Sequence, residues 1–260
     1  MIRITVLSEN TSREGFESEH GLSLFIKTDK HSILFDMGQG ELFLRNADRL
    51  GIDLRDVDVA VLSHGHYDHG GGLKAFLDIN EKADVFVSRY AFCDYRNANG
   101  NYIGLDSSLS DCNRLKYVSC DTVIDGELTV AVSANEHFPV VTDLTEMTEV
   151  STVPDRFLHE QYLIITDGNK KTVISGCSHR GVLNVAKTHT PDCLAGGFHI
   201  SKILLDEAGR VQICELARAL TDTGAKYYTC HCTGTAQYEY LKSLMGDRIE
   251  YISAGSSIDI

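Results

Sequence analysis

The chain has 260 residues, 43% of them hydrophobic, so it can bury a large core, and we expect a single domain over residues 1–260. It carries 24 Lys and Arg against 37 Asp and Glu, and this formal net charge of -13 argues against a nucleic-acid partner. We expect no signal peptide and no membrane span, and the eight scattered cysteines favour free thiols in the cytoplasm. The sequence predicts no particular oligomeric state.

The first half of the chain alternates between strand-like and helical patterns. Apolar residues predict strands over residues 2–7, 22–27, 32–36, 57–62 and 84–88. Helices are predicted over 42–50 and 73–79. Residues 90–120 are irregular, with a strong turn signal at 97–101. Such a segment either covers a pocket or is an ordinary surface excursion.

The second half repeats this alternation. Strands are predicted over residues 128–133, 162–166, 172–175, 195–198, 226–229 and 249–253. Helices are predicted over 181–187, 211–221 and 237–245, and the apolar face of the second consists of Val211, Cys214, Leu216, Ala217 and Leu220. Two comparable halves rich in strands predict an α+β fold, in which sheets pack on each other with helices outside.

Four metal-binding side chains follow the apolar stretch 57–62 within six positions. They are His64, His66, Asp68 and His69. Imidazole nitrogens and a carboxylate oxygen suit a catalytic divalent cation. In an extended turn residues i and i+2 point the same way, so His64 and His66 are expected to converge on one ion. Asp68 and His69 then face a second ion, and the pattern predicts a metal-dependent hydrolase.

Three later turns also place a histidine after a strand-like segment. We expect His179 to complete the His64/His66 ion and His231 to complete the Asp68/His69 ion. The alternative for each is that it supports a ligand without touching metal. His199 either contacts substrate or is a core histidine bonded to a carbonyl.

Three more residues are candidates near the centre. Cys177 is a candidate thiolate ligand or bridge, and a buried inert thiol is the alternative. Asp36 ends a strand and is expected to orient a ligand loop by hydrogen bonds, without touching metal. His20 precedes Gly21 and is expected to reach the pocket edge or the substrate.

Other cysteines and histidines lack such a context. Cys230 and Cys232 are separated by one residue, which is the spacing of neither a zinc knuckle nor a redox motif, so we expect both to pack in the core. The histidines without a comparable setting are His31, His137, His159 and His189. The chain has no Gly-x-Ser-x-Gly elbow, Walker loop or dinucleotide fingerprint.

The His-x-His-x-Asp-His motif after a buried strand resembles that of the metallo-β-lactamase superfamily. A closer resemblance is to its 7,8-dihydropterin-6-methyl-4-(β-D-ribofuranosyl)aminobenzene 5′-phosphate synthase-like branch. The matching segments are residues 20–23, 35–39, 63–73, 176–181, 196–199, 231–234 and 253–256. The resemblance implies a four-layered αββα sandwich with metals at one edge of the two sheets. The superfamily's later bridging Asp appears here as Cys177 or is absent. How strongly the second metal binds, and which metal it is, are therefore left open.

The motifs and the resemblance together predict hydrolysis of an ester, with a phosphoester favoured, by a metal-activated water. The cofactors are expected to be two divalent ions, zinc first and manganese or iron as alternatives. Asp68 would also orient the attacking water, and the substrate is expected to be a small anionic molecule. The alternatives are a dihydropterin-type condensation that releases pyrophosphate, a di-iron oxidoreductase, and a non-catalytic metal-binding or ligand-sensing module.

Overall fold

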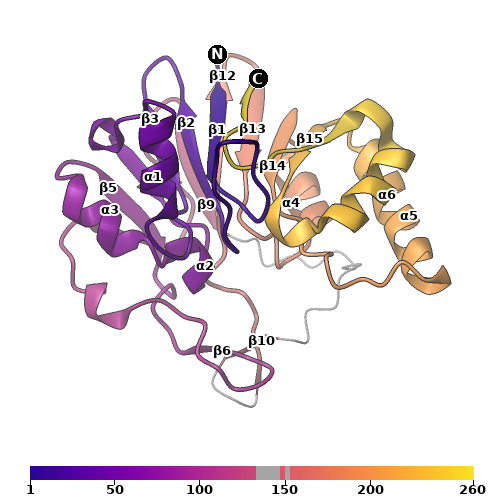
Figure 1. Cartoon of the computed structure of the whole chain (residues 1–260), viewed down its shortest axis with the longest axis horizontal. Helices are drawn as coiled ribbons and strands as arrows, with labels where there is room; N and C mark the ends of the chain where they lie inside the picture. The colour runs from indigo at the N-terminus through magenta and orange to yellow at the C-terminus, as the bar shows by residue number, and fades with distance from the viewer. Residues whose placement is uncertain (133–146, 150–152) are drawn as a thin grey trace.

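Two seven-stranded sheets pack face to face, with helices on both outer sides (Figure 1). The computed structural model describes residues 1–132, 147–149 and 153–260. The first sheet has the strand order β17-β1-β2-β3-β4-β5-β7 and the second β16-β15-β14-β13-β12-β9-β8. The α+β class and the four-layered αββα sandwich are therefore confirmed.

The first sheet comes from the N-terminal half and is completed by the last strand. Its strands are β1 (Arg3–Ser8), β2 (Ser23–Lys27), β3 (Ser32–Phe35), β4 (Val59–Val61), β5 (Asp84–Ser88), β7 (Leu115–Val118) and β17 (Ser257–Asp259). β3, β4, β5 and β7 are parallel neighbours, whereas the pairs that involve β1 or β2 are antiparallel. All three residues of β4 are buried, as expected for a parallel strand covered on both faces.

The second sheet comes from the C-terminal half. Its strands are β8 (Thr122–Val123), β9 (Leu128–Val132), β12 (Gln161–Asp167), β13 (Lys170–Ile174), β14 (Cys193–Gly196), β15 (Lys226–Thr229) and β16 (Ile249–Tyr251). β13 to β16 are parallel neighbours, and β8, β9, β12 and β13 pair antiparallel. A small third sheet contains β6 (Tyr95–Asn97), β10 (Met147–Glu149) and β11 (Val153–Pro154).

Three groups of buried apolar residues hold the four layers together. The central group, including Phe35 and Leu163, lies between the sheets. The group around Phe43 and Phe76 packs the first sheet against α1 (Leu42–Arg49) and α3 (Leu73–Ile79). The third group packs the second sheet against α4 (Val182–His189), α5 (Glu207–Asp222) and α6 (Thr235–Met245). No helix among the described residues has the length and apolar character needed to span a membrane.

Short helical turns complete the described fold. α2 (Tyr67–Gly70) directly follows the ligand-rich turn after β4, at the lower edge of the sheets in Figure 1. The 3-10 turns are η1 (Leu54–Asp56), η2 (Ser107–Leu109), η3 (His231–Thr233) and η4 (Gly246–Arg248). Parallel strands of one sheet end at the same edge, and ligands bind at that carboxyl edge in such sheets. In the first sheet this edge carries the loops after β3 and β4. In the second sheet it carries the loops after β13, β14 and β15.

Several predicted elements differ from the observed ones. The irregular stretch 90–120 contains β6, η2 and β7, and β8 and β17 were also not predicted. The strand predicted over 195–198 is β14, which begins and ends two residues earlier. It ends there because Gly196 adopts a φ of 148° and the chain then leaves the sheet to present His199. Residue 133, the last of another predicted strand, lies outside the described residues.

Candidate metal centre

The turn after β4 and the short helix α2 together place four candidate ligands beneath the end of the first sheet. His66 is extended, with φ -98° and ψ 147°, and Tyr67 starts the helical turn that carries Asp68 and His69. His64 and His69 are fully buried, and His66 and Asp68 nearly so. A side chain at Gly65 would collide with the carbonyl oxygen of Ala91, so this turn needs glycine to pass beneath the 90–97 segment.

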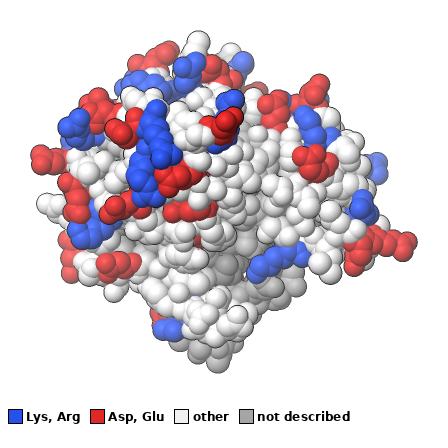
Figure 2. Space-filling model, viewed as in Figure 1, with Lys and Arg blue, Asp and Glu red and all other residues white. Residues whose placement is uncertain are grey.

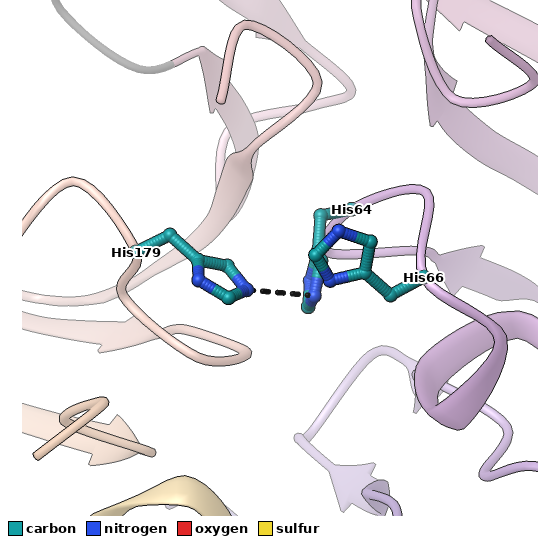
Figure 3. Close-up of side chains that lie close together, drawn as sticks. All are labelled: His64, His66 and His179. Atoms are coloured by element: carbon teal, nitrogen blue, oxygen red, sulfur yellow. Dashed lines mark hydrogen bonds between the residues drawn. The ribbon is translucent and has the colours of Figure 1, made fainter. Parts of the chain in front are cut away.

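His64, His66 and His179 form the first cluster (Figure 3). One ring nitrogen of each lies within 4.8 Å of the others, and Nε2 of His179 is 3.3 Å from Nε2 of His64. The first two come from the β4 turn, and His179 comes from the turn after β13 in the opposite sheet. Its ring stacks on Phe157, with the ring centroids 4.4 Å apart and the planes 3° from parallel.

Asp68, His69 and His231 form the second cluster. Nε2 of His231 lies 3.4 Å from Oδ2 of Asp68 and 3.2 Å from Nε2 of His69. Nε2 of His69 is 3.8 Å from the same carboxylate oxygen. The clusters adjoin, because the ring centroids of His64 and His69 are 4.2 Å apart. The structure thus brings the six candidate ligands together, and it also groups His64 and His69, one from each predicted set, with Cys177.

Hydrogen bonds fix which nitrogen carries the proton in three of these histidines. Nδ1 of His69 lies 2.6 Å from Oδ2 of Asp36, and Nδ1 of His231 lies 2.7 Å from Oδ1 of an asparagine, Asn10. Both oxygens can only accept, so both Nδ1 atoms donate. Nδ1 of His64 lies 2.8 Å from the Ser63 hydroxyl, which itself donates to Asp36 and therefore accepts from the ring.

Nε2 of His64 and Nε2 of His69 therefore each carry a lone pair, and each faces the Nε2 atom of a histidine from the opposite sheet. The facing pairs are His69 with His231 at 3.2 Å and His64 with His179 at 3.3 Å. Among the described residues, Nε2 of His66 is buried and has no hydrogen-bond partner. A cation between the two nitrogens of each pair could bind both as ligands once the opposite nitrogen is unprotonated. The donor set therefore fits divalent cations in both clusters.

Most of these side chains are held in the protonation state that a metal ligand needs, which is a neutral imidazole or an ionised carboxylate. Burial and the neighbouring imidazoles lower the pKa of His64, His66 and His179 well below the usual value, which keeps them neutral. Burial opposes ionisation of Asp68, but His69 and the other neighbouring histidines hold the pKa of its carboxyl well below the usual range.

The pKa of His231 is raised, whereas those of His64, His66 and His179 are lowered. Burial opposes its protonation, but Asp68 and Cys232 outweigh burial and raise the pKa of His231 to about 9 in the metal-free protein. A cation must therefore displace a proton from His231 when it binds.

Two cysteines lie between the clusters. Sγ of Cys177 is 3.2 Å from Nε2 of His69, and it groups with ligands of both clusters. Burial raises the pKa of the Cys177 thiol well above the usual value. Cys232, expected to be a packing residue, instead groups with Cys177 and His231 as a potential ligand. Cys230 packs in the central core as expected.

His199 and His20 border the centre on different sides. The His199 ring is 4.3 Å from that of His179, and its backbone N–H donates to Sγ of Cys232 at 3.3 Å. The His20 side chain is 57% exposed, and its Nε2 lies 3.2 Å from Oδ2 of Asp68. Asp36 lies beneath the centre, where it accepts hydrogen bonds from Ser63 and His69.

Sequence reasoning missed several residues that support the centre. Nδ1 of His159 accepts the N–H of Gly65 at 2.8 Å, and its Nε2 lies 3.0 Å from Asp155. Glu9 and Glu160 accept hydrogen bonds from ligand-bearing loops. No local pattern marks these residues, because their partners are distant in the chain; His159 and Gly65 are separated by 94 positions. His137 lies outside the described residues.

Comparisons with known proteins agree with this geometry. The family model of the metallo-β-lactamase superfamily matches residues 19–186. An uncharacterized protein of Methanocaldococcus jannaschii is 32% identical, with 76% of this chain and 79% of that protein covered. The 7,8-dihydropterin-6-methyl-4-(β-D-ribofuranosyl)-aminobenzene-5′-phosphate synthase of the same organism is 26% identical, with 99% and 96% covered.

A solved structure gives the same family likeness. The crystal structure of Tm1679, described as a metal-dependent hydrolase of the β-lactamase superfamily, superposes with a TM-score of 0.83 at 31% identity. The match covers 100% of this chain and 99% of that one.

Proposed function

The chain belongs to the metallo-β-lactamase superfamily, and we propose that it is a hydrolase that uses two divalent cations, zinc first, against a small phosphoester. The observation that carries this proposal is the convergence of four imidazole Nε2 atoms across the centre, in pairs 3.2 and 3.3 Å apart, with those of His64 and His69 left as acceptors. Imidazole nitrogens arranged in this way suit divalent cations, and cations of this kind serve hydrolysis.

Each proposed cation has three protein ligands. His64, His66 and His179 would hold the first, and Asp68, His69 and His231 the second. When bound, such cations supply a water nucleophile at neutral pH and neutralise charge that develops on phosphoryl oxygens. Cys177 lies close enough to both sets to be an additional ligand.

Three side chains around the proposed cations can contact the attacking water or the substrate. Asp68 is held ionised by its histidine neighbours, so its carboxylate can accept a hydrogen bond from the attacking water and orient it. His20 is exposed beside Asp68 and can donate a hydrogen bond to a substrate oxygen. His199, next to His179, can contact the same substrate from the other side.

A small anionic substrate fits the charge distribution better than a nucleic acid does. The chain carries a formal net charge of -13, and acidic and basic side chains are interspersed on the face drawn in Figure 2. A polyanion would meet repulsion over the wider surface. A small phosphoester would feel mainly the cations and imidazoles of the centre.

A condensing activity is the second candidate. The similarity to the M. jannaschii synthase extends over 99% of this chain, and the name of that protein gives a dihydropterin-linked aminobenzene 5′-phosphate as its product. The same two cations would then hold a phosphorylated substrate while pyrophosphate leaves.

Elemental analysis and an activity panel test the proposal. We expect about two zinc, manganese or iron ions per chain and turnover of a bis(p-nitrophenyl) phosphate reporter. Turnover of a dihydropterin pyrophosphate with an aminobenzene ribofuranosyl phosphate, and of no phosphoester, would favour the synthase. Bound metal without turnover of any ester or pterin would favour a non-catalytic module, and a metal-free protein after reconstitution would contradict both enzyme proposals.

A further inference from the structure

Two buried glutamates that belong to neither ligand set contact the backbone of the ligand histidines. Glu9 follows the first strand of one sheet, and Glu160 precedes β12 in the other. Glu9 is fully buried and Glu160 is 1% exposed. A buried carboxylate is costly unless several donors satisfy it, so the partners of these two indicate what they are for.

Glu160 holds the turn that carries His179. Its Oε1 accepts the backbone N–H of His179 at 2.6 Å, and its Oε2 accepts the N–H of Arg180 at 3.0 Å. The hydroxyl of Tyr162 donates to the same Oε2 at 2.8 Å. The residue before His179 is Ser178, whose φ of 54° lies in the left-handed region. The carboxylate therefore fixes a turn whose backbone is otherwise unfavourable.

Glu9 holds the turn that carries His231 in the same way. Its Oε1 accepts the N–H of His231 at 2.6 Å and the hydroxyl of Tyr251 at 2.7 Å. Its Oε2 accepts the N–H and the hydroxyl of Thr11, both at 2.6 Å. His231 itself has a φ of 51°.

The two glutamates thus repeat one arrangement on the two sides of the centre. In each, a tyrosine hydroxyl and the N–H of a ligand histidine meet on one buried carboxylate. His179 belongs to the first cluster and His231 to the second, so each glutamate accepts the backbone N–H of a histidine from a different cluster.

We propose that Glu160 and Glu9 are positioning residues that each set the affinity of one cation, Glu160 for the His64/His66/His179 position and Glu9 for the Asp68/His69/His231 position. This inference rests on the proposed two-cation site. Groups that orient metal ligands typically change metal affinity by about 10- to 100-fold when they are replaced.

Glu9→Gln and Glu160→Gln test the assignment, because they keep the side-chain volume but replace one acceptor oxygen with a donor. Zinc-loaded protein is dialysed against a graded chelator, the retained zinc is counted, and crystals are used to find which position stays filled. We expect Glu9→Gln to lose the second-cluster zinc at about tenfold less chelator than the wild type while the first-cluster zinc stays. Glu160→Gln should give the reverse.

Asp58→Asn is the matched control. Asp58 also accepts a backbone N–H, that of Ser32 at 3.1 Å, and bonds to a histidine, His31, that belongs to neither cluster. It should retain both zinc ions as the wild type does. Equal loss of both ions from each glutamine variant, or wild-type retention in both, would overturn the inference. A wild type that binds no zinc would instead overturn the proposed function.

Tyrosine variants keep the test decisive if a glutamine variant does not fold. Tyr251→Phe and Tyr162→Phe each remove one donor from the corresponding glutamate and leave the histidine N–H contact in place. We expect a several-fold weaker zinc affinity at the second and the first position, respectively. Unchanged affinity at both positions in both variants would overturn the inference.

Discussion

Asp36 accepts three hydrogen bonds, from two residues of the centre, on one buried carboxylate. It accepts hydrogen bonds from the Ser63 N–H and hydroxyl at 2.7 Å each, and from Nδ1 of His69 at 2.6 Å. We expect Asp36→Ala to lower the free energy of unfolding by about 3 kcal/mol, because it leaves these buried donors unpaired.

The same substitution should also weaken the second cation, since His69 loses the bond that orients its ring. Urea unfolding and zinc counting measure the two effects. Wild-type stability together with two tightly held zinc ions would show that Asp36 has neither role.

Asp68 allows a separation of ligand and catalytic effects. Its side chain is 11% exposed, and the carboxylate lies between His20, His69 and His231. We expect Asp68→Asn to fold but to lower kcat at least about 100-fold, because an amide neither carries the ligand charge nor accepts as strongly from water. The kinetics are measured on a phosphodiester with the zinc content determined in the same sample. Full turnover with full zinc content would refute the role of Asp68.

The residues of the centre divide into those that a local pattern reveals and those that it does not. His64, His66, Asp68 and His69 lie within six positions, so the sequence alone indicates a metal site. Cys232 has no such signal, because its importance depends on Cys177 from another strand end, 55 positions away. Burial and non-local hydrogen bonds define these supporting residues, and neither is visible in a window of the sequence.

At the scale of elements, α5 shows why helix ends are harder to predict than helix existence. Apolar periodicity predicted a start at residue 211, but the helix begins at Glu207, where Asp206 caps it by accepting the N–H of Gly209 at 2.9 Å. The predicted face was partly wrong, since Val211 is 53% exposed and Ile213 is buried. The cap is a hydrogen bond rather than an apolar repeat, so periodicity missed it.

Asp206→Ala tests the importance of this cap. We expect a loss of about 1 kcal/mol in the free energy of unfolding, because the first turn loses a side-chain acceptor for its free N–H groups. Thermal unfolding followed by circular dichroism measures it, with Asp222→Ala, at the last residue of the same helix, as the control. An equal loss in both variants would count against a specific capping effect.

At the scale of the whole molecule, the sequence indicated two packed sheets but not the contacts that join them. One such contact is His31, whose Nδ1 lies 3.0 Å from Asp58 beside the first sheet and whose Nε2 lies 3.0 Å from Asp125 in the turn before β9. Burial lowers the pKa of His31, but the hydrogen bonds to both carboxylates outweigh burial and raise it above its ordinary 6.5. The bond from His31 and the N–H groups of Glu127 and Leu128 lower the pKa of Asp125 to about 2.

These shifts predict a pH window for the contact. The raised His31 pKa contributes stability fully below about pH 6.5, and this is lost as the pH rises through the folded value. The lowered Asp125 pKa contributes above about pH 4, and this is lost as the pH falls toward 2. We expect His31→Asn to cost most near pH 5, about 1 kcal/mol or less because the groups are partly exposed, and less at pH 8.5. Urea unfolding at both pH values measures this, and an equal cost at both would contradict it.

The central core and the metal centre both join the two halves, so we infer that residues 1–260 unfold as one domain. Phe35 and Ile4 from the first sheet share a single apolar cluster with Leu163 and Ile174 from the second. Each proposed cation likewise takes ligands from both sheets, and a cation that binds only the folded state stabilises it by RT ln(1 + [L]/Kd), about 2.7 kcal/mol at 100 times Kd.

Removing zinc with a chelator should therefore lower the melting temperature, and the protein should still unfold in a single transition. Scanning calorimetry measures both. Two separate transitions, of which only one moves with zinc, would mean that the halves fold independently and that the centre does not bridge them.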